Sequence, residues 1–198
     1  LVEGDGEHVP PEGYPYRVSD AQSFLDARTT PTFDTHVDTY VWCLGNGATP
    51  AWGHMNTGIW PCLESEDRAT DLIVEACHGR GMEVWGSLRM NDIHDSFMAH
   101  SLEEASEPFK AEHPDCLIGG PEDRVLPLEL AERYLWTALN FAEERVRKYR
   151  LDYIEEQARR HDFDGLELDF TRFVWNFPLG REIEMAPIMT GFVRQVRE

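Results

Sequence analysis

The segment Asp162-Phe-Asp-Gly-Leu-Glu-Leu-Asp-Phe-Thr-Arg-Phe173 decides the predicted fold class. Apolar and acidic residues alternate over 165–170, which is the period-two pattern of a β-strand with two different faces. The face expected to pack on helices carries Leu166, Leu168 and Phe170, and the opposite face carries Gly165, Glu167, Asp169 and Thr171. Two carboxylates therefore share the face that points away from the helices, with Asp169 nearer the carboxyl end of the strand.

Strands and helices alternate along the rest of the chain. Predicted strands cover 1–4, 37–44 and 82–88, and predicted helices cover 19–28, 66–80 and 143–161, with a last helix starting near Met185. Ser19 is the expected N-cap of the first helix. The stripe expected to be buried on the third helix contains Val146, Leu151, Ile154 and Ala158. This order of elements predicts an α/β fold with parallel strands and right-handed crossovers.

Both a doubly wound sheet and a (β/α)8 TIM barrel fit this order. The loops that follow the strands are long and polar, whereas the links from helix to strand at 79–81 and 161–164 are short, as in a barrel whose site lies at the carboxyl ends of the strands. No phosphate-binding glycine loop follows any strand. Since a complete barrel takes about 250 residues, we expect 1–198 to be the N-terminal half of one barrel domain, with about four βα units and truncated at both ends.

The composition narrows the classes of partner. The 198 residues contain 37 acidic and 18 basic side chains, a net charge of -19, which disfavours nucleic acid. No apolar run is long enough for a membrane span. The chain begins at Leu1 and not at Met, so export stays open for what we expect to be a soluble protein. The widely spaced cysteines, expected as buried free thiols, are Cys43, Cys62, Cys77 and Cys116.

Candidate catalytic residues lie at two neighbouring strand ends. Alternation over the third strand places Arg89 on the same face as Glu167 and Asp169, where an inward charge needs a partner. Asp169 is the first catalytic candidate, because an acid at a barrel strand's carboxyl end is poorly explained by stability. Glu167 lies deeper, so it is either catalytic or a buried structural partner of Arg89.

The loop after the third strand, Arg89-Met-Asn-Asp-Ile-His-Asp95, adds an amide, two carboxylates and an imidazole. Asp92 is the further catalytic candidate. Carboxylates from adjacent strand ends stand roughly 5 to 9 Å apart, which covers both retaining and inverting glycosidases. The residues expected to bind a carbohydrate substrate are Arg89, Asn91, His94, Asp95, Arg172, Trp42 and Trp175. Weaker candidates are Asp5, Trp52 and Trp60.

The segments 81–92, with His94 and Asp95, and 162–173 resemble the bacterial family-10-like glycosyl hydrolase proteins, and 37–45 adds to the resemblance. The resemblance implies a glycosidase-like barrel of which this chain is the N-terminal half. Compared with the chitinase pattern D-x-x-D-x-D-x-E, Glu167 and Asp169 occupy the two middle acidic places, but Thr171 stands where the catalytic Glu belongs. A chitinase-type acid is therefore absent.

Three functions stay open from the sequence. The first is a glycoside hydrolase that uses paired carboxylates and no cofactor. The second is a metal-dependent hydrolase that uses Asp92, His94 and Asp95, although their spacing matches no closed metal signature. The third is a carbohydrate-binding barrel without catalysis, which is favoured by Thr171 standing in place of a catalytic Glu.

Overall fold

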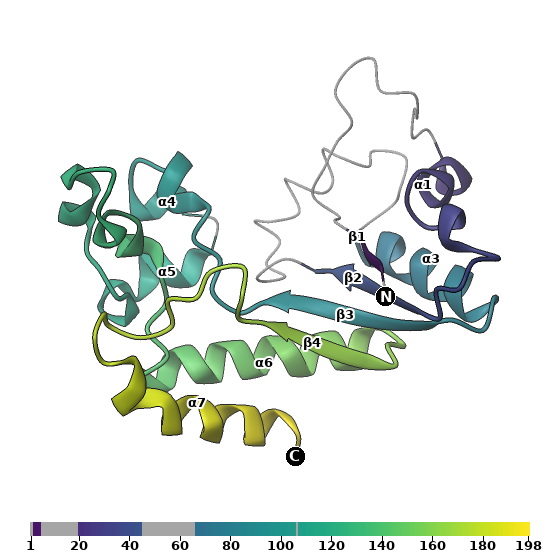
Figure 1. The fold of residues 1–198 in the computed structure, drawn as a ribbon. Helices are drawn as coiled ribbons and strands as arrows, with labels where there is room; N and C mark the ends of the chain where they lie inside the picture. Colours follow the sequence, from purple (N-terminus) through teal and green to yellow (C-terminus); the bar gives the residue numbers. More distant parts are fainter. Residues whose placement is uncertain (1, 5–19, 45–65, 106) are drawn as a thin grey trace. The chain divides into compact units, whose positions relative to one another are not determined.

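The computed structural model describes residues 2–4, 20–44, 66–105 and 107–198 (Figure 1). Its parallel sheet has the order β1-β2-β3-β4, built from β1 (Val2–Gly4), β2 (Thr39–Cys43), β3 (Glu83–Arg89) and β4 (Gly165–Asp169). The predicted α/β class is confirmed. Sequential order is the arrangement of a barrel, and the reversal of order that marks a doubly wound sheet is absent among these four described strands.

The chain divides into two compact units. The first contains 1–89 and 156–169, and the second contains 90–155 and 170–198. The first unit carries the sheet with α1 (Ala21–Arg28) and α3 (Glu66–His78). The second carries α4 (Asp95–Met98), α5 (Pro108–Glu112), α7 (Glu182–Val196) and most of α6 (Glu144–Arg160). Short 3-10 turns fill the stretch between α4 and α6, as the composition of that loop predicts.

The core of the first unit lies between the sheet and its helices. Tyr40, Trp42 and Val84 extend from β2 and β3, and Phe24 from α1 meets Trp42 edge to face, with ring centroids 6.1 Å apart. Helix α3 contributes mainly Ala69, Leu72, Ile73, Val74 and Cys77. The N-cap of α1 is Asp20, whose carboxylate accepts the Ser23 N–H in a capping box, whereas the predicted cap Ser19 lies outside the described residues.

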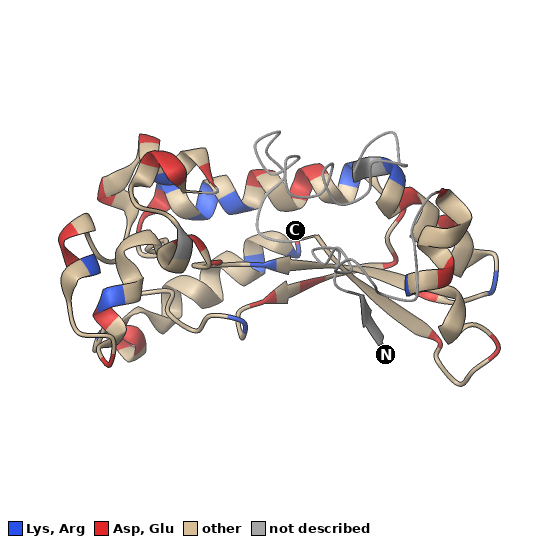
Figure 2. Cartoon of the chain, turned by 90° about the horizontal axis from the view of Figure 1, so that it is seen from above, with Lys and Arg blue, Asp and Glu red and all other residues tan. Residues whose placement is uncertain are grey.

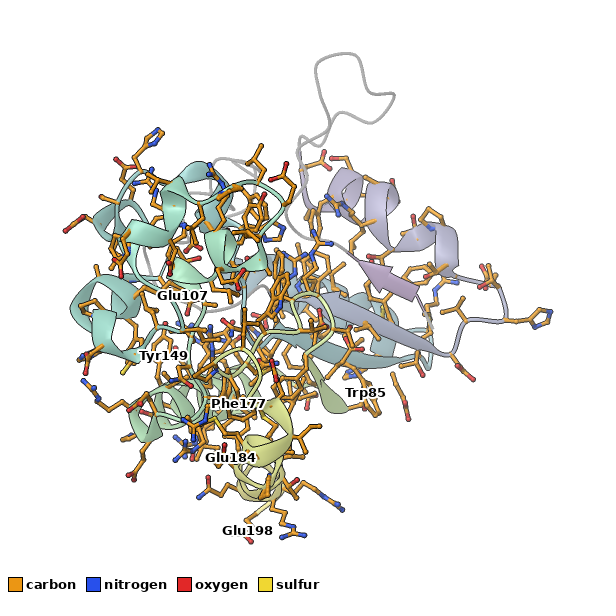
Figure 3. The ribbon with its side chains drawn as sticks, turned by 60° about the vertical axis from the view of Figure 1, so that its left-hand side comes forward. Trp85, Glu107, Tyr149, Phe177, Glu184 and Glu198 are labelled. Carbon is orange, nitrogen blue, oxygen red and sulfur yellow. The ribbon has the colours of Figure 1, made fainter. Side chains whose placement is uncertain are left out.

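The two faces of β3 follow the predicted alternation. Val84, Gly86 and Leu88 are buried towards the helices, and Glu83, Trp85, Ser87 and Arg89 share the other face. On that face the indole of Trp85 lies over Gly165 of β4, since a Cβ at Gly165 would stand 2.8 Å from the Trp85 ring (Figure 3). Glycine at 165 therefore makes room for an aromatic side chain on the neighbouring strand.

The amino ends of the strands are held by polar contacts. Asp164, just before β4, accepts the Val84 N–H at 2.7 Å and a contact from His78 Nε2 at 2.9 Å. His161 Nδ1 lies 2.9 Å from Asp71 Oδ1 in the same unit. Gly81, at φ 73, closes the short link between α3 and β3, where the left-handed conformation favours glycine. These contacts fit the structural role of this edge in βα folds.

The second unit buries more charge than the sequence suggests. Acidic and basic side chains are spread over the helices of the chain (Figure 2). On α6, Val146 and Ile154 are buried as predicted and Leu151 is half-buried, but Ala158 is exposed. The buried positions beside them are Arg150, Tyr153 and Gln157. The observed buried stripe thus differs from the predicted one, and it includes Arg150, which has a buried ionic partner described below.

Three of the four cysteines lie in the described residues, and Cys43, Cys77 and Cys116 are buried free thiols as expected. Burial raises the pKa of Cys77 to about 11, which makes it an unreactive thiol. Cys62 lies outside the described residues. Across the described ranges, no helix combines the length and the apolar character that a bilayer crossing needs.

Candidate functional site

The carboxyl ends of β3 and β4 bring a cation and an acid into register. Arg89 is the pairing partner of Asp169, and Ser87 is the partner of Glu167. Partners in register share a face, so Arg89, Asp169 and Glu167 lie on the side away from the helices, as predicted. Arg89 is buried and Asp169 half-buried. Glu167 is exposed, and its register partner, two pairs before Arg89, is Ser87, which contradicts the interpretation of Glu167 as a buried partner of Arg89.

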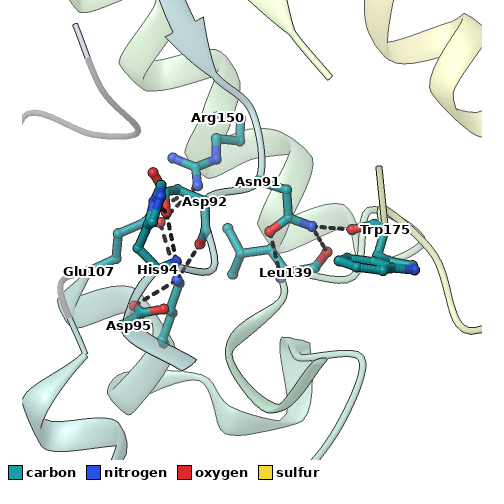
Figure 4. Close-up of polar contacts among 9 residues, drawn as sticks. Asn91, Asp92, His94, Asp95, Glu107, Leu139, Arg150 and Trp175 are labelled. Carbon is teal, nitrogen blue, oxygen red and sulfur yellow. Dashed lines mark hydrogen bonds and ion pairs between the residues drawn. The ribbon is translucent and has the colours of Figure 1, made fainter. Parts of the chain in front are cut away.

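Asn91, in the loop after β3, links three segments of the second unit. Its amide nitrogen donates to the carbonyl oxygens of Leu139 at 2.9 Å and Trp175 at 2.6 Å, and its oxygen accepts the Leu139 N–H at 2.9 Å (Figure 4). The side chain is 2% exposed. Both N–H donors and one acceptor position of this buried amide serve the backbone, so the predicted contact with substrate is replaced by a structural one.

Asp92 and His94 form an acid–imidazole pair. The Asp92 carboxylate accepts the His94 N–H at 2.8 Å, which makes an Asx turn, and Asp92 Oδ1 lies 2.6 Å from His94 Nδ1. Asp92 is buried, whereas the His94 side chain is 33% exposed. The sequence predicts Asp92 as a catalytic acid, but in this geometry its carboxylate orients the imidazole that reaches the surface.

Arg172 extends the Asp92–His94 pair to a chain of three residues. Its guanidinium nitrogen lies 3.0 Å from His94 Nε2, and a guanidinium has only donors, so Nε2 accepts and carries no proton. The proton of the neutral ring therefore sits on Nδ1 and is donated to Asp92. The ring edge of His94 also meets Phe173, with centroids 5.0 Å apart. The second unit thus presents one imidazole in a fixed tautomer beside an exposed guanidinium.

Asp95 belongs to a buried ionic cluster of four residues, Asp95, Glu107, Lys110 and Arg150 (Figure 4). Lys110 Nζ lies 2.9 Å from Asp95 Oδ2 and 3.5 Å from Glu107 Oε1, and Arg150 lies 2.9 Å from Glu107 Oε2. Lys110 also donates to the backbone carbonyl of Asp92 at 2.8 Å. Asp95, predicted to bind substrate, is only 4% exposed and is instead a structural anion.

The sequence does not predict this cluster, because the segment Glu107-Pro-Phe-Lys110 matches no known motif. The pKa of Tyr149, which lies near Glu107 (Figure 3), is raised well above its ordinary value, first by burial and then by the charge of Glu107. The charge of Glu107 therefore also acts on Tyr149 of α6, the helix that supplies Arg150 of the cluster.

Three aromatic side chains pack on a small core of the second unit, and one of them, Phe173, contacts His94. Tyr134, Phe173 and Trp175 pack as half-buried residues on a small core of Ile93, Leu135 and Ala138. Trp175 is half-buried against this core in the second unit, and its contact with substrate stays a prediction. Trp42 is 4% exposed in the core of the first unit, where its indole donates to Thr70, so packing accounts for it and the predicted sugar contact is not supported. Asp5, Trp52 and Trp60 lie outside the described residues.

The donors of the predicted metal alternative do not converge. His94 Nδ1 is hydrogen-bonded to Asp92. The carboxylate of Asp95 accepts a hydrogen bond from the ammonium group of Lys110, so the oxygen that would bind a metal ion is already engaged. Among the residues that the structure describes, no three His, Cys, Asp or Glu side chains are grouped as a metal site.

No family model matches the chain, and no curated protein matches it. Solved glycosidases share its fold. An α-galactosidase from Thermus thermophilus, in complex with p-nitrophenyl α-D-galactopyranoside, is 16% identical over 94% of this chain and 35% of its own, with a TM-score of 0.51. The galactosidase domain of an α-galactosidase-sucrose kinase is 14% identical over 98% of this chain and 24% of its own, with a TM-score of 0.57.

An α-amylase from Geobacillus thermoleovorans, complexed with acarbose, is 15% identical over 99% of this chain and 41% of its own, with a TM-score of 0.52. The chain thus spans between a quarter and two fifths of the length of these three structures. At these identities the likeness concerns the fold. The chain has the fold of a part of several glycosidases.

Proposed function

We propose that this chain is part of a glycoside hydrolase and forms the N-terminal half of its (β/α)8 barrel, in keeping with the resemblance to family-10-like glycosyl hydrolases. The observation that carries the proposal is the register of Asp169 with the buried Arg89 at the carboxyl end of the sheet. In barrel enzymes that end holds the reacting groups. An acid there, on the face away from the helices, has a position suited to catalysis.

In the proposed reaction one carboxylic acid protonates the leaving oxygen and a second carboxylate attacks the sugar or activates water. We assign Asp169 to one of these two tasks. Glu167, exposed on the same face two residues earlier, is the second candidate within this chain. Arg172, whose exposed guanidinium is oriented by His94 and through it by Asp92, contributes hydrogen bonds to sugar hydroxyls.

The test measures release of reducing sugar by the full-length polypeptide that contains this chain. The panel includes p-nitrophenyl α-galactoside and starch, because two of the similar structures are an α-galactosidase and an α-amylase, together with other neutral and acidic polysaccharides. Turnover is expected to survive a chelator and to fall to background in Asp169→Asn. The control is Asp162→Asn, which removes a carboxylate that is 94% exposed and should leave turnover intact. Full activity in Asp169→Asn would overturn the assignment.

A carbohydrate-binding barrel without catalysis is the second candidate. Thr171 in place of an acid and the aromatic residues around His94 favour it. It predicts glycan binding by the wild-type protein with no product from any substrate, with or without divalent metal.

A further inference from the structure

Phe97 is an exposed aromatic residue in the loop after β3. It lies on the short helix α4 and is 59% exposed. Its ring stacks on Tyr134, with centroids 4.9 Å apart and an interplanar angle of 29°. A single exposed apolar side chain is common on protein surfaces, but here the exposed ring is stacked on a second aromatic ring, which makes a larger flat apolar surface. The pair therefore offers an apolar surface that the described residues leave accessible.

Tyr134 gives this surface a fixed base. Its ring packs against the core of Ile93, Leu135 and Ala138, and its hydroxyl donates to the Leu128 carbonyl oxygen at 3.1 Å. Phe97 consequently rests on a ring that is held by both packing and a hydrogen bond. A preorganised ring loses little conformational entropy when a ligand stacks on it.

The same turn of chain carries polar groups. The Phe97 N–H donates to the His94 carbonyl oxygen at 3.1 Å, so the aromatic ring and the imidazole belong to one turn. His94 is bonded to Arg172 and Asp92, as described above. A pyranose suits a turn that carries both an exposed ring and polar side chains, because its C–H groups form an apolar face and its hydroxyls lie at the rim.

The charge around the rings selects among sugars. Apart from the buried Asp95, the segments 95–105 and 121–134, which supply Phe97 and Tyr134, contain six acidic and two basic residues. Both arginines, Arg124 and Arg133, donate to backbone carbonyls of His100 and Leu126. A uronic acid would meet this negative potential, whereas a neutral hexose would not.

We propose that Phe97 and Tyr134 form a stacking subsite for a neutral hexopyranose unit of a glycan chain, next to the His94–Arg172 pair. The subsite deepens the proposed function and rests on it for the class of ligand. It binds a sugar by its apolar face and does not take part in bond cleavage.

The experiment measures binding of maltohexaose, cellohexaose and stachyose, with trigalacturonic acid as the acidic probe, by calorimetry on the full-length polypeptide. All proteins carry Asp169→Asn so that no probe is consumed, and the wild type is assayed for turnover in parallel. Phe97→Ala should weaken binding of a neutral probe about two- to tenfold, the worth of one aromatic contact. Phe97→Trp should retain binding. Val125→Ala, at an apolar side chain that is 85% exposed in the same unit, should change nothing.

Equal affinity in Phe97→Ala and its parent, tighter binding of the acidic probe, or no binding of any neutral probe would overturn the subsite. Such a failure is separate from failure of the glycosidase. If the wild type shows turnover and Phe97→Ala binds the neutral probes as tightly as its parent, only the subsite proposal is refuted. If binding depends on Phe97 but the wild type shows no turnover, only the hydrolase proposal is refuted, and the non-catalytic barrel is favoured.

Discussion

Lys110 and Asp95 form an ion pair inside the second unit, with Nζ 2.9 Å from Oδ2 and side chains that are 0% and 4% exposed. The ammonium group also donates to the Asp92 carbonyl oxygen. Two of its three donors therefore hold the loop that carries His94. A buried charge of this kind is stable only while all its partners are present.

Lys110→Met should destabilise the protein strongly, because it leaves Asp95 and Glu107 without their shared cation. We expect a loss of about 3–5 kcal/mol in the free energy of unfolding, the range for removing one partner of a buried pair. Denaturant titration followed by circular dichroism measures it. Lys148→Met is the matched control: its pair with Asp152 is exposed, and its loss should cost at most about 1 kcal/mol. Equal effects of the two variants would contradict the role of Lys110.

Asn91→Asp should be more harmful than its small change in shape suggests. The new carboxylate oxygen would face the carbonyls of Leu139 and Trp175 without a hydrogen to donate. Each buried carbonyl left without its donor costs about 1–3 kcal/mol. Thermal unfolding measures the loss. Gln22→Glu makes the same chemical change at an exposed amide on α1 and should cost much less, and the reverse ranking would exclude Asn91 as the link.

Asp164 should contribute to the acid sensitivity of the first unit. Its pKa lies below the ordinary value because the Val84 N–H, and then His78, bind the carboxylate. The unfolded chain has an Asp pKa of about 3.9, and the folded protein has a lower one. The ionised carboxylate therefore stabilises the folded state fully above about pH 3.9, and this contribution is lost as the pH falls through the pKa of the folded state. Asp164→Asn should flatten the fall of melting temperature below about pH 5. Asp162→Asn, at an exposed carboxylate, should retain the wild-type slope, and identical slopes in all three proteins would refute the linkage.

Gly165→Ala should disturb the contact between β4 and β3. The added Cβ would stand 2.8 Å from the Trp85 indole, so the ring must move. Overpacking of this kind costs about 1–3 kcal/mol. Unfolding measures the cost, and the fluorescence of the native state should shift. Gly191→Ala in α7 meets nothing within 4 Å and should stabilise by up to about 1 kcal/mol. A neutral Gly165→Ala with unchanged fluorescence would show that the ring adapts freely.

The regular parts of the fold follow from the sequence. The period-two segments around Val84 and Leu166 place both strands within one residue of their observed bounds and predict their faces. Helix α3 is also predicted closely, because its apolar stripe is long and Gly81 ends the link after it. For the same reason Arg89 and Asp169 are correctly placed on one face, although only the register shows that they oppose each other.

The loop after β3 could not be predicted to the same extent. Its charges pair across distances of 15 to 43 residues, as in Lys110 with Asp95 and Arg150 with Glu107, and no local periodicity encodes such pairs. Sequence spacing grouped Asp92, His94 and Asp95 as equivalent polar residues. Tertiary packing separates them, since only the His94 ring emerges at the surface while both acids are engaged beneath it.

The side chain of Asn91 holds the backbones of three segments together. The exposed side chains of those segments are therefore not needed to keep the segments in place. Substitution at an exposed position such as Val174, next to Trp175, can then alter what this segment contacts without altering how it is held. Directed libraries restricted to such positions, with Asn91 and Lys110 kept constant, are a rational route to changing ligand preference in this chain.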